Sequence, residues 1–156
     1  MVRQTAMGKI NSRSKGVRGE TEVIKILTDE LGGGADKLTF KRDIEQYRQG
    51  DLGDIICSDP NFPFTVEVKL YARGYGAQPS WWDQVCVAAQ ACHKLPLLVY
   101  RYDRVPWRWR FPVAAIVGMA GYIPNGDLTE QYDWRYAMEC DTATAMMIIR
   151  EHLADG

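Results

Sequence analysis

Asp54, Glu67 and Lys69 have the side-chain types and spacing suited to cutting a phosphodiester bond. Asp54 begins one short β-prone run, and Glu67 and Lys69 alternate within the next. Hydrolysis of a phosphodiester needs an acidic water, neutralised charge on the phosphate and a stabilised leaving oxygen. Mg²⁺ held by carboxylates beside a lysine can supply all three. These three residues are therefore candidate catalytic residues.

A β-hairpin is predicted to position these side chains. Residues 54–57 and 64–70 are β-prone, and the intervening segment 58–63 is dense in turn residues. Successive side chains of a strand point to opposite faces, so Glu67 and Lys69 share one face of the second strand. The ammonium can therefore reach the space in front of the carboxylates.

The register of this hairpin decides whether the two acids meet. If it folds symmetrically about residues 60–61, Ile55 lies across from Val66 and Asp54 lies across from Glu67. Cross-strand Cβ atoms are roughly 5 Å apart, which is close enough for two carboxylates to share one divalent cation. A slip of one residue would separate the acids.

The spacing alone leaves a second interpretation open, in which Glu67 and Lys69 form a solvent-facing pair and Asp54 is a turn residue. Glu20 favours the chemical interpretation. It lies four residues before Ile24 on the apolar stripe of a predicted helix, where an acid must be desolvated, paired or bound to metal. A plain surface acid would lie elsewhere on the helix, as Glu22 is predicted to do.

Helix and strand patterns alternate along the chain and predict a single α/β domain, a mixed central sheet flanked by helices. Apolar residues recur at helical spacing over 15–31, and Gly32 to Gly34 end this helix. Ser80 and Asp83 form a capping box for a second helix that runs to about residue 93. The remaining predicted elements are strands at 37–41 and 97–100, one or two strands within 107–117, and a helix over 141–153 capped by Asp141.

The composition is that of an ordinary globular protein, with 46% hydrophobic and 25% charged residues in a chain of 156. No stretch is apolar over the roughly 20 residues that cross a bilayer, and the N-terminus lacks the apolar run of a secretory signal. We therefore expect no membrane partner. The cysteines lack the spacing of zinc ligands and favour free thiols in a reducing cytoplasm; they are Cys57, Cys86, Cys92 and Cys140.

The net charge of −1 is spread unevenly along the chain. No acid precedes Glu20, while several lysines and arginines do. Residues 1–14 are predicted to be a flexible basic arm, and residues 15–156 to form the domain. The charge alone leaves two roles for the arm open, contact with phosphates or a basic tail of no specific use.

Several short motifs, taken in order, resemble the PD-(D/E)xK nucleases. Lys15-Gly16-Val17-Arg18-Gly19-Glu20 opens the first helix, Asp54-Ile55-Ile56 begins the hairpin, Glu67-Val68-Lys69 follows, and Gln84 lies on the next helix. Gly53 stands where the proline of the motif would be. More specifically, the motifs are similar to those of archaeal-type Holliday-junction resolvases and their bacteriophage relatives. The resemblance covers roughly residues 15–102, and the segment from about Trp107 matches no such pattern.

This resemblance implies a restriction-endonuclease-like fold and a nuclease site that uses Mg²⁺, with Mn²⁺ as a substitute. Lys69 would orient the attacking water and stabilise charge, and Gln84 would lie at the edge of the site. The metal ligands that it implies are Asp54, Glu67, the carbonyl of Val68, and Glu20.

The resemblance also implies DNA as partner and a homodimer that places two sites on opposing strands of a four-way junction. The function expected is metal-dependent, structure-specific endonuclease activity, as a Holliday-junction resolvase. Another repair or restriction-like nuclease of the superfamily, or a catalytically silent DNA-binding protein, stays open as an alternative. The predicted phosphate contacts are Arg13, Lys15, Arg18, Lys41, Arg42, Arg48 and Arg73. Four tryptophans could stack on splayed bases, although core or dimer interface is favoured for Trp81, Trp82, Trp107 and Trp109.

Overall fold

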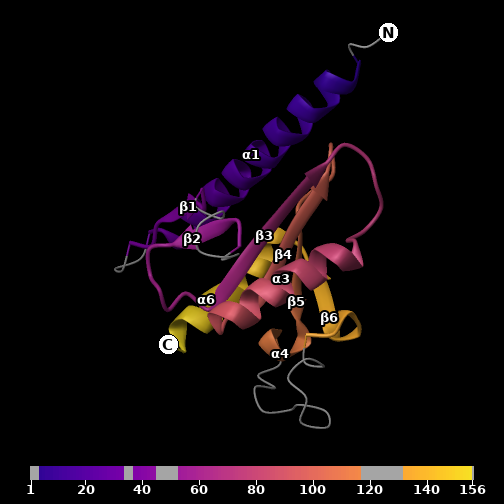
Figure 1. Cartoon of the computed structure of the whole chain (residues 1–156). Coiled ribbons are helices and arrows are strands. Elements are labelled where there is room, and N and C mark those ends of the chain that lie inside the picture. The colour runs from indigo at the N-terminus through magenta and orange to yellow at the C-terminus, as the bar shows by residue number, and fades with distance from the viewer. Residues whose placement is uncertain (1–3, 34–36, 45–52, 117–131, 156) are drawn as a thin grey trace.

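The structure, a computed structural model, describes residues 4–33, 37–44, 53–116 and 132–155, and only the backbone of residues 4–12. Within these ranges six strands form one mixed sheet in the order β1-β2-β3-β4-β5-β6. Helices cover both faces of the sheet (Figure 1). The predicted α/β fold, a mixed central sheet flanked by helices in a single domain, is confirmed.

The two long central strands of the sheet are parallel, and every other neighbouring pair is antiparallel. A parallel pair needs a crossover connection, which α3 provides between β3 and β4. The strands are β1 (Phe40–Arg42), β2 (Ile55–Cys57), β3 (Phe64–Tyr71), β4 (Leu95–Tyr102), β5 (Arg108–Pro112) and β6 (Ala137–Cys140).

Two helices cover one face of this sheet and one helix covers the other. The larger core lies between the sheet, α1 (Gln4–Leu31) and α6 (Thr142–Ala154). The smaller core lies under α3 (Pro79–Cys92). The short helices α4 (Val113–Ile116) and η2 (Trp134–Tyr136) complete the described elements.

The alternation of side chains along β3 separates core from site. Val66, Val68 and Leu70 belong to the larger core on the α1 side. Glu67 and Lys69 therefore project from the opposite face, on which α3 lies. One strand thus contributes both to the stability of the fold and to the candidate site.

The ends of two helices differ from those predicted. The helix α1 begins at Gln4, so the boundary expected between residues 14 and 15 falls inside it, and the flexibility of the arm stays a prediction. The capping box at Ser80 and Asp83 is wrong, because α3 begins at Pro79 and its N-cap is Gln78. Proline at the first helical position has a preset φ and lacks an N–H that would need a partner there.

The C-terminal third holds two confirmed predictions and one strand that was not predicted. The Asp141 side chain accepts a hydrogen bond from the Thr144 N–H at 2.8 Å and caps α6 as predicted. One strand, β5, lies in the described part of the region 107–117, within the one or two that were predicted, and the short helix α4 follows it. The edge strand β6 was not predicted, because its four residues carry no alternating pattern and its pairing with β5 supplies the order.

The environments of the tryptophans and cysteines agree with most of the predictions made for them. Trp82 and Trp109 are fully buried and Trp107 nearly so, whereas Trp81 is only partly buried. All four cysteines carry free thiols. No helix among the described residues is both long and apolar enough to cross a bilayer.

Candidate active site

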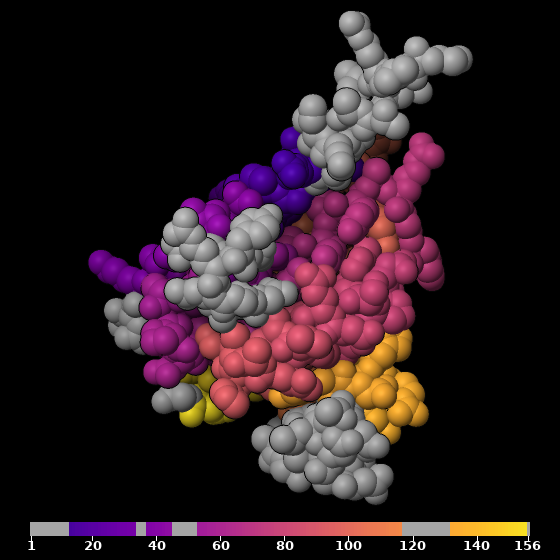
Figure 2. All heavy atoms as spheres, viewed as in Figure 1, coloured from indigo at the N-terminus to yellow at the C-terminus, as the bar shows by residue number. Residues whose placement is uncertain are grey.

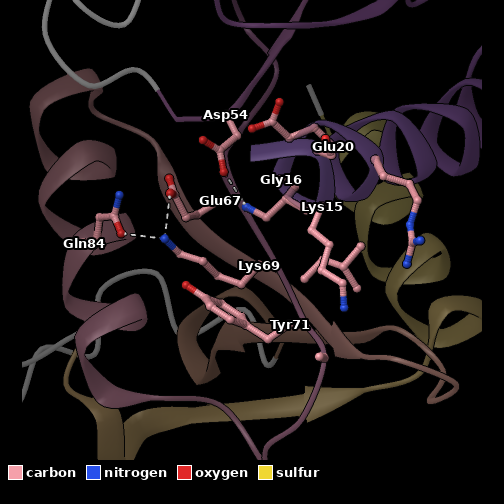
Figure 3. A pocket seen from close by; sticks show the side chains of 13 residues that line it. Lys15, Gly16, Glu20, Asp54, Glu67, Lys69, Tyr71 and Gln84 are labelled. Atoms are coloured by element: carbon pink, nitrogen blue, oxygen red, sulfur yellow. Dashed lines mark hydrogen bonds and ion pairs between the residues drawn. The ribbon is translucent and has the colours of Figure 1, made fainter. Parts of the chain in front are cut away.

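The hairpin register brings the two predicted acids together. Ile55 pairs with Val66, as predicted, and the Asp54 N–H donates to the Val66 carbonyl at 2.8 Å. Asp54, Glu67 and Lys69 therefore line one pocket of about 890 Å³. Figure 3 shows these side chains next to one another, with Glu20 entering from α1 and Gln84 from α3.

Each side chain of the central group is held by a specific contact. Asp54 is 8% exposed, and its Oδ2 accepts the Val68 N–H at 2.8 Å. Glu67 is 2% exposed and lies 3.5 Å from the Lys69 ammonium. The same ammonium donates to the Gln84 Oε1 at 2.9 Å (Figure 3). Lys69 is thus positioned from both sides, by an acid on its own strand and by an amide on α3.

Gly53 explains why this chain departs from the proline of the motif. Its φ is +87°, a value that proline cannot adopt, since its ring fixes φ near −65°. A Cβ at this position would also lie 2.8 Å from the Val66 carbonyl oxygen. The close approach of the Gly53 backbone to β3 therefore requires glycine and sets the position of Asp54.

Glu20 enters the pocket from α1 in an ion pair with Arg42. The Arg42 Nε donates to the Glu20 Oε2, and the Glu20 side chain is 17% exposed. Burial raises the pKa of Glu20 above its ordinary value of 4.5, the Arg42 hydrogen bond opposes that shift, and the nearby Asp54 carboxylate adds to it. Keeping Glu20 charged in this partly buried position therefore costs free energy, which a nearby cation can offset.

This raised pKa makes a prediction about stability. The native state binds the Glu20 proton more tightly than the unfolded state, so the stabilisation is present below the ordinary pKa and is lost as pH rises through the raised one. Glu20→Gln keeps an oxygen for Arg42 but does not titrate. We expect its free energy of unfolding, relative to the unchanged protein, to increase from about pH 4 to about pH 7. Urea unfolding at both pH values measures this, and a constant difference would contradict it.

The donor set of the pocket fits a hard divalent cation. Carboxylate oxygens are the ligands that Mg²⁺ prefers, and it is commonly bound by one or two carboxylates together with substrate phosphates. Asp54 and Glu67 are buried acids of this kind. Among the residues that the structure describes, no three His, Cys, Asp or Glu side chains form a ready cluster for an ion. Glu20 engages Arg42 instead, so the two acids from the hairpin are the better placed pair.

The predicted phosphate contacts other than Arg42, which pairs with Glu20, fall into three groups. Lys15 and Arg18 line the pocket, but both form ion pairs with Asp103. Exposed positions are occupied by Arg13, Lys41 and Arg73. Arg48 lies outside the described residues.

Sequence reasoning missed several partners in and around the pocket. The pairing of Arg42 with Glu20 was not foreseen, and Glu22, predicted to be exposed, is half-buried and binds Arg101 at 2.9 Å. These pairs join residues far apart in the chain, which no local pattern indicates. Tyr71 also lines the pocket, and its position two residues after Lys69 on the same strand face could have indicated it.

Comparison with known proteins identifies a family and distant likenesses among solved structures. The model of the family described as "Phage putative PDDEXK endonuclease" matches residues 11–122. Among solved structures, one similar to this chain is Hjc of Archaeoglobus fulgidus, a Holliday junction resolvase from an archaeal hyperthermophile. It is 18% identical, with a TM-score of 0.45, and the match covers 63% of this chain and 76% of that chain. No curated protein matches this chain.

Proposed function

Because this chain belongs to the phage PDDEXK endonuclease family, we propose that it is a metal-dependent endonuclease that hydrolyses DNA at the pocket between β2, β3, α1 and α3. The observation that carries the proposal is the convergence of Asp54, Glu67 and Lys69 in that pocket. Two buried carboxylates and an ammonium suit phosphodiester hydrolysis better than a purely structural role. Burying charged groups costs free energy of folding unless other charges or hydrogen bonds compensate them, so such groups are more often functional.

The residues divide the work of hydrolysis. Asp54 and Glu67, with the Val68 carbonyl, would hold Mg²⁺ or Mn²⁺, and Glu20 would add a carboxylate after leaving Arg42. When bound, the metal acidifies water and neutralises phosphate charge. Lys69 orients the attacking water and stabilises the charge that develops on the phosphate.

Gln84 positions the Lys69 ammonium through the hydrogen bond that the two side chains share. The attacking water adds to phosphorus as the bond to the leaving oxygen breaks. Arg42, released from Glu20, becomes available for a phosphate, as Arg13, Lys41, Arg48 and Arg73 would be. Lys15 and Arg18 lie beside the pocket for the same purpose once they leave Asp103.

The preferred substrate that we propose is the four-way DNA junction. Its support is the order of motifs from Lys15 through Glu20 to Lys69 and Gln84, which resembles that of junction resolvases. A homodimer would place two sites on opposing strands. Four free thiols are compatible with action in the reducing cytoplasm of a prokaryotic or phage-infected cell.

The experiment compares cleavage of a four-way junction, a flap and a linear duplex of matched sequence and concentration. We expect the junction to be cut fastest in Mg²⁺ or Mn²⁺, and chelation by EDTA to abolish cutting, because the proposed site lacks another source of an acidic water. Restoring either metal should restore the rate. Gel analysis of end-labelled strands gives both the rate and the positions of the cuts.

Other results of this experiment would change the proposal. Faster cutting of linear duplex would replace the junction by a repair or restriction-like substrate. Binding of DNA without cutting in either metal would leave a DNA-binding protein on a nuclease scaffold. Cutting that persists in EDTA would rule out the metal-dependent mechanism.

A further inference from the structure

An aromatic surface adjoins the candidate site at the end of β3. Tyr71 follows Glu67 and Lys69 on the same face of the strand and lines the same pocket. Figure 3 shows its ring beside the Lys69 side chain. Tyr71 is 45% exposed, so part of the ring is open where a bound DNA strand would pass.

Tyr71 is held in place by a second ring. It stacks on Trp81 with centroids 5.1 Å apart and an angle of 5° between the planes. Trp81 packs in turn against Tyr100 and Tyr102 of β4, at centroid distances of 5.9 Å and 6.3 Å. The Tyr71 ring is therefore already ordered by its neighbours. The protein would lose little further conformational freedom when another ring stacks on it.

The loop 72–78, which leads from β3 to α3, presents another tyrosine. A Cβ on Gly74 would lie 2.2 Å from the Tyr102 ring, so the loop backbone lies directly against that ring. The Tyr102 hydroxyl donates to the Gly76 carbonyl at 2.6 Å. Tyr75, between these two points, is 97% exposed. An anchored loop thus holds an aromatic side chain in solvent, close in sequence to Tyr71.

The loop begins at the pocket, because Ala72, its first residue, also lines it. Figure 1 shows the loop curving away from the sheet between the end of β3 and the start of α3, and in Figure 2 it stands out at the upper right of the molecule. Arg73, also exposed, lies between the two tyrosines in the sequence and adds a positive charge suited to a phosphate. The surface therefore combines aromatic rings with a cation, the combination that binds nucleic acid without sequence preference.

We propose that Tyr71 and Tyr75 form a base-stacking site that receives an unpaired nucleobase of DNA next to the phosphate to be cut. This inference rests on the proposed function, since it takes DNA as the substrate. A paired base presents only its edge to the protein, whereas an unpaired base exposes a face that can stack on tyrosine. The site would therefore direct the enzyme to DNA that is branched, bulged or frayed at the cut.

Binding of three short DNAs of matched sequence tests the proposal in EDTA, where no cutting is expected. One is fully paired, one carries a single unpaired adenine, and one carries an abasic nucleotide at that position. The full chain should bind the unpaired adenine roughly tenfold or more tightly than the abasic DNA, as measured by fluorescence anisotropy. Tyr75→Ala and Tyr71→Ala should each remove most of this preference, while Tyr75→Phe keeps it because the ring remains.

Two controls separate stacking from other effects. Tyr136→Ala removes a tyrosine that is 43% exposed on η2, outside the pocket, and should leave the preference intact. An unpaired 2-aminopurine in place of adenine should lose fluorescence on binding, since stacking on tyrosine quenches it, and Tyr75→Ala should reduce this loss. Circular dichroism checks whether Tyr71→Ala remains folded. If it does not, the test rests on Tyr75→Ala, which should fold normally because Tyr75 is exposed.

The results distinguish this inference from the proposed function. Equal binding of adenine and abasic DNA, or a Tyr75→Ala variant that keeps the preference, overturns the stacking site. Cleavage by the unchanged protein is measured on the same DNAs in Mg²⁺. Cleavage without base preference refutes only the stacking site, whereas base preference without cleavage refutes only the nuclease proposal.

Discussion

Asp54→Asn is expected to slow DNA cleavage by on the order of 10³-fold, because it removes one of the two buried carboxylates that would hold the metal. The asparagine side chain keeps an oxygen that can accept the Val68 N–H, as Asp54 does at 2.8 Å. The fold and the affinity for DNA should therefore persist. Single-turnover cleavage of the junction, with anisotropy for binding, measures both quantities.

A matched substitution provides the control for this variant. Asp29 lies on the exposed surface of α1, where it pairs with Lys25, and Asp29→Asn makes the same chemical change away from the pocket. We expect cleavage by Asp29→Asn to equal that of the unchanged protein. An Asp54→Asn protein that cuts as fast as this control would show that the site lies elsewhere.

Lys69→Met is expected to lower the cleavage rate by roughly 10²- to 10³-fold, since it removes the cation that stabilises charge on the phosphate. It should also lower the free energy of unfolding by about 3 kcal/mol, because the buried Glu67 loses the ammonium that lies 3.5 Å away. Cleavage and urea unfolding, measured at one temperature, report the two losses separately.

A double variant tests whether the stability lost in Lys69→Met comes from the charge left on Glu67. Glu67→Gln combined with Lys69→Met removes the charge that Lys69→Met leaves behind, so much of the lost stability should return. The cleavage rate should remain low, since Glu67 is also one of the proposed metal ligands. Recovery of the rate together with stability would mean that both side chains support the fold and take no part in the reaction.

Much of the fold was predictable because its signals are local. The apolar periodicity of α1 and α6, and the alternation along β3, each lie within one segment and specify which side becomes buried. The register that joins Ile55 to Val66 was also predictable, since the turn between the two strands is short. Strand β6 escaped prediction because an edge strand of four residues depends on its neighbour for order.

The elements that carry the site were predictable to the same degree, while their charge partners were not. Glu67 and Lys69 share a strand face by alternation, and Gln84 meets Lys69 because the following helix packs on that face. Arg42 was expected to contact phosphate but binds Glu20, and Lys15 was expected to do so but binds Asp103. Each of these ion pairs joins elements whose proximity appears only after folding.

The amino-acid sequence by itself determined which side chains could perform hydrolysis and on which elements they lie, because residue type and strand alternation are properties of a short stretch of chain. Only the tertiary structure decided which cation faces Glu20, why glycine must precede Asp54, and that Tyr71 rests on Trp81 beside the pocket. These features depend on the packing of α1, the hairpin and α3 against one another. Contacts between distant segments follow from that packing and leave no periodic signal in the sequence.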